Sequence, residues 1–258
     1  GDTLRFLKIA KHGHTVNRDH SVFISDYIDG MSAEATRRNY MLEVVSFEGQ
    51  PISVIAESLA GAPISGVIAL GTELSESDIR VIQGFGLPTV FIDTFYDVID
   101  ANFVDMNNED AVHKALSRLH KQGFERIGFV ASHVDTTNFR LRQDAFFKNM
   151  ARLGLKVRET DVISVESTYD GAYNDTRSLL QGGISLAECY FCTNDVIAGG
   201  ASISLNSMLY EESGWYRWLG SLSPSLAVFV TFSILPGVVC ITIRITIGNT
   251  ISAADIPP

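Results

Sequence analysis

The sequence has few cysteines, few basic residues and no apolar leader. Its 258 residues include three cysteines, an odd number, so we expect no disulfide framework and a reducing compartment. Lys and Arg number 20 against 30 Asp and Glu, and the resulting net charge of -10 would repel a phosphate backbone. Residues 1–5 show neither the basic segment nor the apolar run of a signal peptide. We therefore expect a cytoplasmic chain that does not itself bind DNA.

The signatures of common enzymes are also missing. No G-x-S-x-G, P-loop or G-x-G-x-x-G motif stands at an expected strand-to-helix turn, and no nucleophile has a base at a recognisable spacing. We therefore expect no catalytic residue, no cofactor and no enzyme activity.

Two groups of residues could hold a metal ion. Cys189 and Cys192 have a C-x-x-C spacing, but they stand in an apolar run without a second pair, which favours buried core thiols. The segment 12–20 contains three histidines and Asp19, which could form a metal cluster or a solvated loop; the loop is the simpler interpretation. We predict no stoichiometric metal and no disulfide.

Hydrophobic residues make up 46% of the chain and charged residues 19%, which is enough to bury one large core or two lobes. Up to about residue 200, apolar runs typical of strands alternate with amphipathic stretches typical of helices, and this order predicts parallel sheets covered by helices. The expected strands are 5–11, 41–47, 65–71, 87–93, 102–106, 126–130, 162–167 and 188–192. The expected helices are 24–35, one starting near 78, 109–121, 139–153 and 173–180.

Functional residues of open α/β sheets lie beyond the carboxyl ends of the strands, where loops and helix N-termini meet. This rule selects the loop 12–20, Gly71-Thr72-Glu73, Asp93, Thr137-Asn138-Arg140, Thr168-Tyr169 and Asn194-Asp195. The set is polar and includes aromatic rings. It suits a neutral polyol such as a sugar, because amides and carboxylates bond hydroxyl groups while rings cover C–H faces.

Several segments match the motifs of one known family in order and spacing. They are Ser65 to Asp78, Leu87 to Asp93, Leu119-x-x-x-Gly123-x-x-Arg126-Ile127 within Asn107 to Val130, Arg140-x-Arg142 within Thr136 to Phe146, and Phe191-x-x-Asn194-Asp195-x-x-Ala198-x-Gly200. Over residues 20–200 the chain thus resembles the effector-binding domain of the LacI/GalR family of bacterial transcription regulators.

The resemblance implies an α/β fold of two Rossmann-like lobes, of the periplasmic binding protein type I kind, with an atypical C-terminal part. It implies an N-terminal lobe at 1–106, a C-terminal lobe at 107–200 and a divergent tail at 201–258, a β-rich return segment. It also implies that the ligand meets Phe23, Asp93, Arg140, Tyr169, Asn194 and Asp195. With the strand-end residues Thr72 and Asn138, these are the predicted ligand-binding residues.

Some of these residues also have structural interpretations. Asp93 could cap the following turn, and Asn194-Asp195 could cap the next helix, a role compatible with ligand binding. Arg140 stands near a helix start, where a cation opposes the helix dipole, which favours a functional role.

Two family features are missing. The DNA-binding helix-turn-helix headpiece does not precede this segment, so we expect a fragment or a cleaved core. After Gly200 the family's Gly-(Phe/Tyr)-Asp-Asp motif is also missing, and residues 218–243 carry no charge. This tail could be a membrane span, which Thr231, Ser233 and the Pro236-Gly237 pair interrupt, a pair of strands, or a sequence foreign to the family through divergence or a frameshift.

The sequence therefore predicts the sensor domain of a LacI-type regulator. It would bind a small, sugar-like effector between two lobes and act allosterically on operator DNA only through the absent headpiece. We expect a homodimer, with apolar surface beside the helix that carries Ile24, Tyr27, Ile28 and Met31, and no membrane association. The alternative is an extracytoplasmic sugar-binding protein of a transport or chemotaxis system.

Overall fold

The computed structural model describes residues 2–12, 21–212, 226–235 and 238–247. The chain divides into two compact units, one of residues 1–107 with 134–140, the other of residues 108–133 with 141–258. Both units are built on parallel sheets flanked by helices, so the predicted α/β class is confirmed. The predicted boundary at residue 200 stays a prediction.

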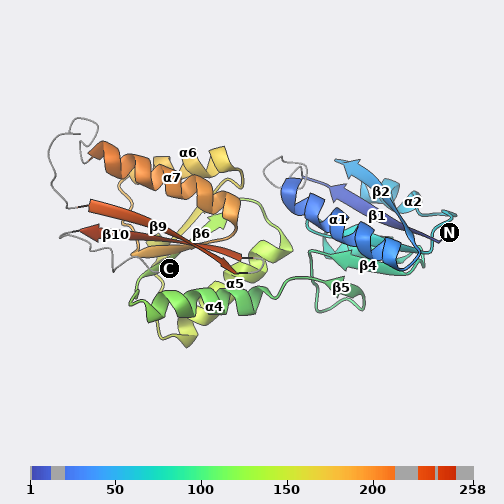
Figure 1. The fold of residues 1–258 in the computed structure, drawn as a ribbon, viewed down its shortest axis with the longest axis horizontal. Coiled ribbons are helices and arrows are strands. Elements are labelled where there is room, and N and C mark those ends of the chain that lie inside the picture. The colour runs from blue at the N-terminus through green and yellow to red at the C-terminus, as the bar shows by residue number, and fades with distance from the viewer. Residues whose placement is uncertain (1, 13–20, 213–225, 236–237, 248–258) are drawn as a thin grey trace. The chain divides into compact units, whose positions relative to one another are not determined.

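Unit 1 contains a five-stranded parallel sheet (Figure 1). Its strand order is β2-β1-β3-β4-β5, from β1 (Thr3–Ala10), β2 (Met41–Glu48), β3 (Gly66–Leu70), β4 (Thr89–Ile92) and β5 (Asn102–Val104). The helices are α1 (Ser21–Arg37), α2 (Ile52–Glu57) and α3 (Glu76–Gln83). The short helix α2 is not among the predicted elements.

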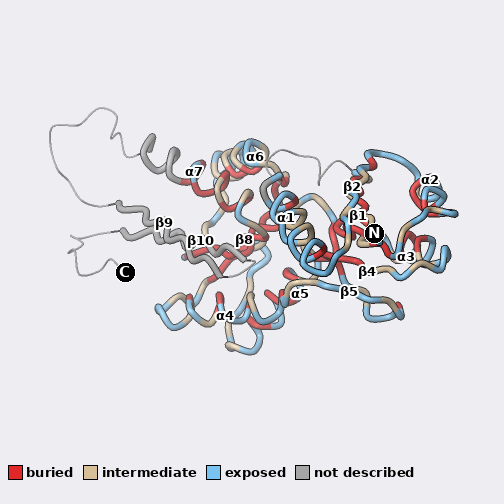
Figure 2. Tube along the Cα trace, turned by 45° about the vertical axis from the view of Figure 1, so that its right-hand side comes forward, coloured by how far each residue is buried: buried red, intermediate tan, exposed pale blue. Residues whose placement is uncertain are grey.

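Both faces of the central strands of this sheet pack against buried clusters, which explains why β1, β3 and β4 read as apolar runs. On one face, Ile24 of α1 packs with Phe6 and Leu70, as the helical apolar stripe predicts. On the other face, Leu7 and Phe91 belong to a larger cluster. Successive residues of β1 thus point to opposite cores, and Figure 2 shows buried residues following the strands while the outer turns of α1 are exposed.

Unit 2 contains a three-stranded parallel sheet in the order β7-β6-β8. Its strands are β6 (Ile127–Ser132), β7 (Val162–Val165) and β8 (Cys189–Cys192), and its helices are α4 (Asn108–Lys121), α5 (Thr137–Arg152), α6 (Tyr169–Gln181) and α7 (Asp195–Glu212), with a short 3-10 helix at Glu159–Asp161. The first turn of α5 belongs to unit 1 and the rest of this helix to unit 2.

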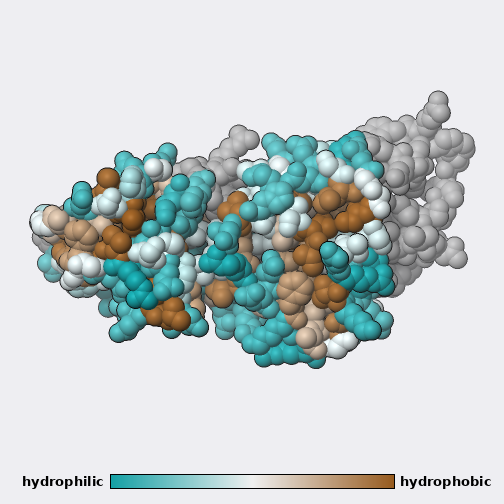
Figure 3. Space-filling model, turned by 180° about the vertical axis from the view of Figure 1, so that it is seen from behind, coloured by the Kyte–Doolittle hydropathy of each residue, from teal (hydrophilic) through white to brown (hydrophobic). Residues whose placement is uncertain are grey.

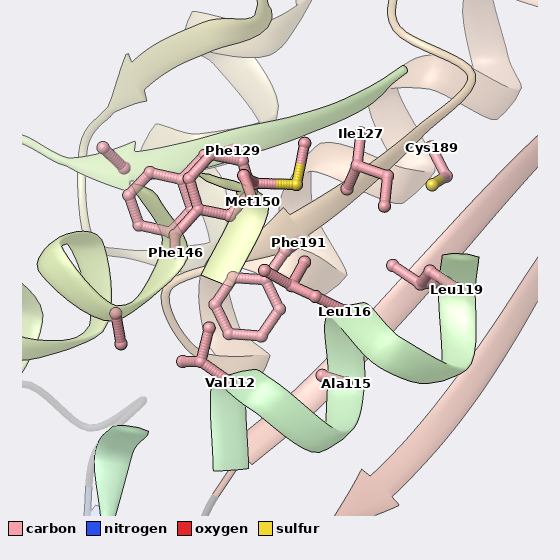
Figure 4. Packing of buried hydrophobic residues seen from close by; sticks show 12 residues of the cluster. Val112, Ala115, Leu116, Leu119, Ile127, Phe129, Phe146, Met150, Cys189 and Phe191 are labelled. Atoms are coloured by element: carbon pink, nitrogen blue, oxygen red, sulfur yellow. The ribbon is translucent and has the colours of Figure 1, made fainter. Parts of the chain in front are cut away.

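Three phenylalanines from two strands and a helix form the centre of unit 2 (Figure 4). Phe129 of β6 stacks on Phe146 of α5 with ring centroids 5.0 Å apart, and on Phe191 of β8 at 5.9 Å. All three rings are buried, and burial of each contributes about 1.5–3 kcal/mol. This contact fixes α5 against the sheet.

Helix α6 begins four residues earlier than the predicted start at residue 173. Thr168 is its N-cap, because its hydroxyl accepts a hydrogen bond from the Gly171 amide at 3.0 Å. A Cβ at Gly200 of α7 would lie 2.3 Å from the Tyr169 carbonyl oxygen, so the two helices touch through a residue that has no side chain. Thr168 and Tyr169 therefore lie at the start of a helix rather than in a loop.

The C-terminal part contains the pair of strands that the sequence favours. β9 (Leu226–Leu235) and β10 (Val238–Ile247) pair antiparallel. Among the described residues, none of the helices is both long enough and apolar enough to cross a membrane. β9 and β10 cluster with unit 2.

Candidate functional site

The carboxyl ends of β3 and β4 hold a compact polar cluster in unit 1. The Thr72 hydroxyl donates a hydrogen bond to Asp93 Oδ2 at 2.5 Å, and Asn138 Nδ2 donates to Asp93 Oδ1 at 2.8 Å. The exposed fractions of Thr72, Asp93 and Asn138 are 8%, 4% and 3%. The strand-end rule thus selects three residues that the fold brings into direct contact.

The backbone around Asp93 fits only particular residues. Asp93 has a φ of +60°, a left-handed conformation that Asp and Asn adopt more readily than most residues. Its neighbour Thr94 is fully buried, and a Cβ at Gly71 would lie 2.3 Å from the Thr94 methyl carbon. Gly71 therefore lets the end of β3 approach the end of β4, and this places Thr72 beside the carboxylate.

Asn138 reaches Asp93 from the first turn of α5. Thr136 caps this turn, because its hydroxyl accepts a hydrogen bond from the Phe139 amide at 3.2 Å. Thr137 donates to the Tyr96 hydroxyl at 3.0 Å, which in turn donates to the Leu74 carbonyl at 2.7 Å. Three side chains of α5's cap and first turn are thus fixed within unit 1.

This cluster has a definite chemical preference. A buried carboxylate accepts hydrogen bonds from hydroxyl, amine or amide groups and repels anions. Thr72 and Asn138 are neutral donors to this carboxylate. The arrangement can bind a neutral ligand rich in hydroxyl groups.

An ion pair lies beyond β1 in the same unit. Lys11 Nζ contacts Asp78 Oδ2 at 2.5 Å, and the Ser75 amide donates to the same oxygen at 2.9 Å. Burial alone would raise the pKa of Asp78, but the bonds from Lys11 and Ser75 outweigh it and hold the pKa below its usual value. Ser75 and Asp78 also form the capping box of α3, so Asp78 has a structural role.

In unit 2 the corresponding strand end is organised by an arginine. Arg142 is buried, with its Nε donating to Asn108 Oδ1 at 2.9 Å and its Nη1 donating to the Thr193 carbonyl at 2.9 Å. Thr193 follows β8 directly, so the guanidinium lies at the carboxyl edge of this sheet. The sequence analysis selects Arg140 as a site residue but not Arg142. Arg142 lies two residues further along α5, on the face toward the sheet, and this position is the signal that could have identified it.

Arg140 itself lies at the surface. Its side chain is 50% exposed, and it pairs with Asp135 at 2.6 Å. Its second donor goes to the Thr137 hydroxyl at 3.2 Å. The structure therefore gives Arg140 an ion pair across the start of α5, while its role toward a ligand stays a prediction.

The remaining predicted residues lie at helix starts. Asn194 accepts a hydrogen bond from the Ile197 amide at 2.9 Å and caps α7, and exposed Asp195 bonds the Val196 amide at 3.0 Å. The Tyr169 ring of α6 lies against Gly199 of α7, where an added Cβ would come within 3.1 Å of the ring. Phe23 lies on α1, 38% exposed, with its ring 4.6 Å from that of Tyr27.

The two groups suspected of metal binding have different outcomes. Cys189 and Cys192 are buried free thiols, as favoured from the sequence, and burial raises the pKa of Cys192 to about 12. Of the segment 12–20, only His12 is described; His14 and His20 lie outside the described residues. Within the described ranges, no three His, Cys, Asp or Glu side chains are grouped to hold a metal ion.

Comparison with known proteins points to one kind of domain. Residues 116–231 match the periplasmic binding protein-like domain family. The ribose operon repressor of Escherichia coli K12 is 24% identical over 222 residues, which cover 85% of this chain and 67% of the repressor. The transcriptional repressor PurR of Haemophilus influenzae Rd is 24% identical over 196 residues, which cover 75% of this chain and 58% of that protein.

Solved structures show the same fold. A complex of the transcriptional regulator CelR with cellobiose has a TM-score of 0.68 at 19% identity and covers 81% of this chain and 63% of that one. The Lac repressor bound to ONPG has a TM-score of 0.67 at 17% identity, with coverage of 83% and 61%. The resemblance found in the sequence is confirmed as a similarity: residues 116–231 match a periplasmic binding protein-like domain, the chain is similar in sequence to bacterial transcriptional repressors, and its fold is similar to that of the Lac repressor.

Proposed function

We propose that this chain is the effector-sensing part of a LacI-type transcriptional regulator and that it binds a small neutral sugar. The observation that carries the proposal is the buried cluster of Thr72, Asp93 and Asn138, in which a carboxylate at the carboxyl ends of parallel strands accepts hydrogen bonds from a hydroxyl and an amide. The regulatory relatives and the absence of an enzyme motif support a cytoplasmic sensor without catalytic activity.

Sugar binding is tested by isothermal titration calorimetry with D-ribose and cellobiose. We expect the chain to bind at least one of them, and the Asp93→Asn variant to bind it more weakly. The matched control is Gln143→Ala, which removes an exposed amide from the same helix that carries Asn138. Failure of the folded wild type to bind either sugar would contradict the proposal.

The proposed regulator acts as a homodimer. The apolar stripe of α1 packs in the core of unit 1. The edge strand β2 exposes Met41 and Val44, which can contribute apolar surface to a dimer interface. On the face seen in Figure 3, hydrophobic side chains form patches among hydrophilic ones. We expect light scattering to give the mass of a dimer at tens of micromolar; a monomer that keeps its affinity for sugar would remove this part of the proposal.

The second candidate is a sugar-binding protein outside the cytoplasm, which the description of the matching family favours. The coding sequence upstream of Gly1 separates the two candidates. A helix-turn-helix region there supports the regulator, and a signal peptide supports the transport or chemotaxis protein.

A further inference from the structure

The Asp93 carboxylate is already occupied by the chain's own side chains. Its Oδ1 accepts from Asn138 at 2.8 Å and its Oδ2 from Thr72 at 2.5 Å. The Asn138 amide also donates to the Asp93 main-chain carbonyl at 3.2 Å, so one amide group covers two acceptors.

Thr72 and Asn138, which both donate to Asp93, are attached to the fold in different ways. Thr72 follows β3, whose end is fixed by the hydrogen bond from the Gly71 amide to the Ile92 carbonyl at 2.8 Å. Asn138 belongs to the first turn of α5, which groups with unit 1 although the rest of the helix groups with unit 2. Asn138 is therefore bonded to Asp93 from a helix turn, whereas Thr72 follows a strand end that the sheet holds.

We propose that Asn138 is an internal competitor of the effector: its amide takes the place of a ligand donor on Asp93, and the effector binds there by displacing it. This inference rests on the proposed function. It changes the predicted role of Asn138 from a ligand contact to a group that lowers affinity. It also narrows the ligand class, because only a molecule with its own hydroxyl or amine donor can replace the lost hydrogen bond.

The energetic consequence is a reduced apparent affinity. When a binding-competent state is only partly populated, the measured dissociation constant is the intrinsic constant divided by the populated fraction. Removing the Asn138 amide should remove that penalty. A hydrogen bond to a charged acceptor corresponds to a factor of about 10 or more in an equilibrium constant.

The first test is calorimetric titration of D-ribose and cellobiose into wild type, Asn138→Ala and Gln143→Ala. We expect Asn138→Ala to bind the sugar about tenfold more tightly than wild type, and Gln143→Ala to match wild type. Circular dichroism checks that each variant is folded. Equal or weaker binding by folded Asn138→Ala would overturn the competition alone, because the wild type would still bind sugar. If neither protein binds either sugar, the competition and the proposed function both fail.

The second test uses hydrogen exchange. The amides of Phe139 and Arg140 bond to Thr136 in the first turn of α5, at 3.2 and 3.0 Å. Displacement of Asn138 should loosen this turn, so the sugar should speed exchange of these amides in wild type, and Asn138→Ala should show faster exchange without sugar. A direct contact between Asn138 and the sugar would slow exchange instead, and that result would overturn the proposal.

Discussion

The strand ends of the two units bury charges of opposite sign. In unit 1 the carboxylate of Asp93 is held by a hydroxyl and an amide, and in unit 2 the guanidinium of Arg142 is held by an amide oxygen and a main-chain carbonyl. In both clusters, neutral groups hydrogen-bond to a buried charged side chain. The difference lies in attachment, since Arg142 and both acceptors belong to unit 2, whereas Asn138 comes from the turn of α5 that joins unit 1.

This comparison indicates that the charge of Arg142 has a structural role and that the charge of Asp93 has a role in binding. Arg142 lies on the same helix as Phe146, whose ring is stacked in the core of unit 2, so its position is fixed by packing as well as by hydrogen bonds. Asp93 lies after a four-residue strand and meets partners from two separate segments. We therefore expect substitutions of Arg142 to affect stability and substitutions around Asp93 to affect binding.

The largest expected effect is the loss of Arg142. Arg142→Ala leaves the Asn108 amide oxygen and the Thr193 carbonyl without this donor, and a buried group left unpaired costs about 1–3 kcal/mol. We expect the free energy of unfolding, measured by urea denaturation, to fall by at least about 2 kcal/mol. A change below about 0.5 kcal/mol, typical of surface sites, would show that the guanidinium is not a structural element of unit 2.

The next effect concerns binding at Asp93. Asp93→Asn keeps a residue that tolerates the positive φ but replaces one acceptor oxygen by a donor amide. We expect the variant to remain folded and to bind sugar about 10- to 100-fold more weakly, as loss of a hydrogen bond to a charged group implies. Calorimetry of the folded variant measures this affinity. An unchanged affinity would show that the sugar does not bind at Asp93.

A smaller effect concerns pH and the pair of Lys11 with Asp78. Because the pKa of Asp78 is lowered in the fold, its contribution to stability is present above the ordinary Asp pKa of about 4 and is lost as the pH falls through the lower folded value. The contribution of such a pair is about 1 kcal/mol or less. We expect Lys11→Met to flatten the acid limb of stability against pH, measured by urea denaturation at several pH values. If stability falls with pH in the same way in wild type and Lys11→Met, the ion pair of Lys11 with Asp78 does not contribute to stability.

The smallest effect is expected at Arg140. Its guanidinium is half exposed and already bonds Asp135, so Arg140→Ala should change the free energy of unfolding by less than about 0.5 kcal/mol. For the same reason we expect sugar affinity to fall by less than tenfold, less than for Asp93→Asn. A loss of affinity larger than that of Asp93→Asn would restore Arg140 as the main ligand residue.

The sequence by itself determined the parallel α/β class, the helical stripe of α1, the buried thiols and the position of polar residues after the strands. These features depend on periodicity and on the strand-end rule, which are local properties of the chain. Thr72, Asp93 and Asn138 were all selected in this way.

Only the tertiary structure decided which of these polar residues meet. The Asp93–Asn138 contact joins residues 45 positions apart, and local periodicity carries no signal for it. The choice between Arg140 and Arg142 also depends on which side of α5 packs on the sheet, because a two-residue step along a helix turns a side chain to another face. Burial of Arg142 and exposure of Arg140 follow from that packing, and a hydrogen bond gains its full weight only when the surrounding chain excludes water.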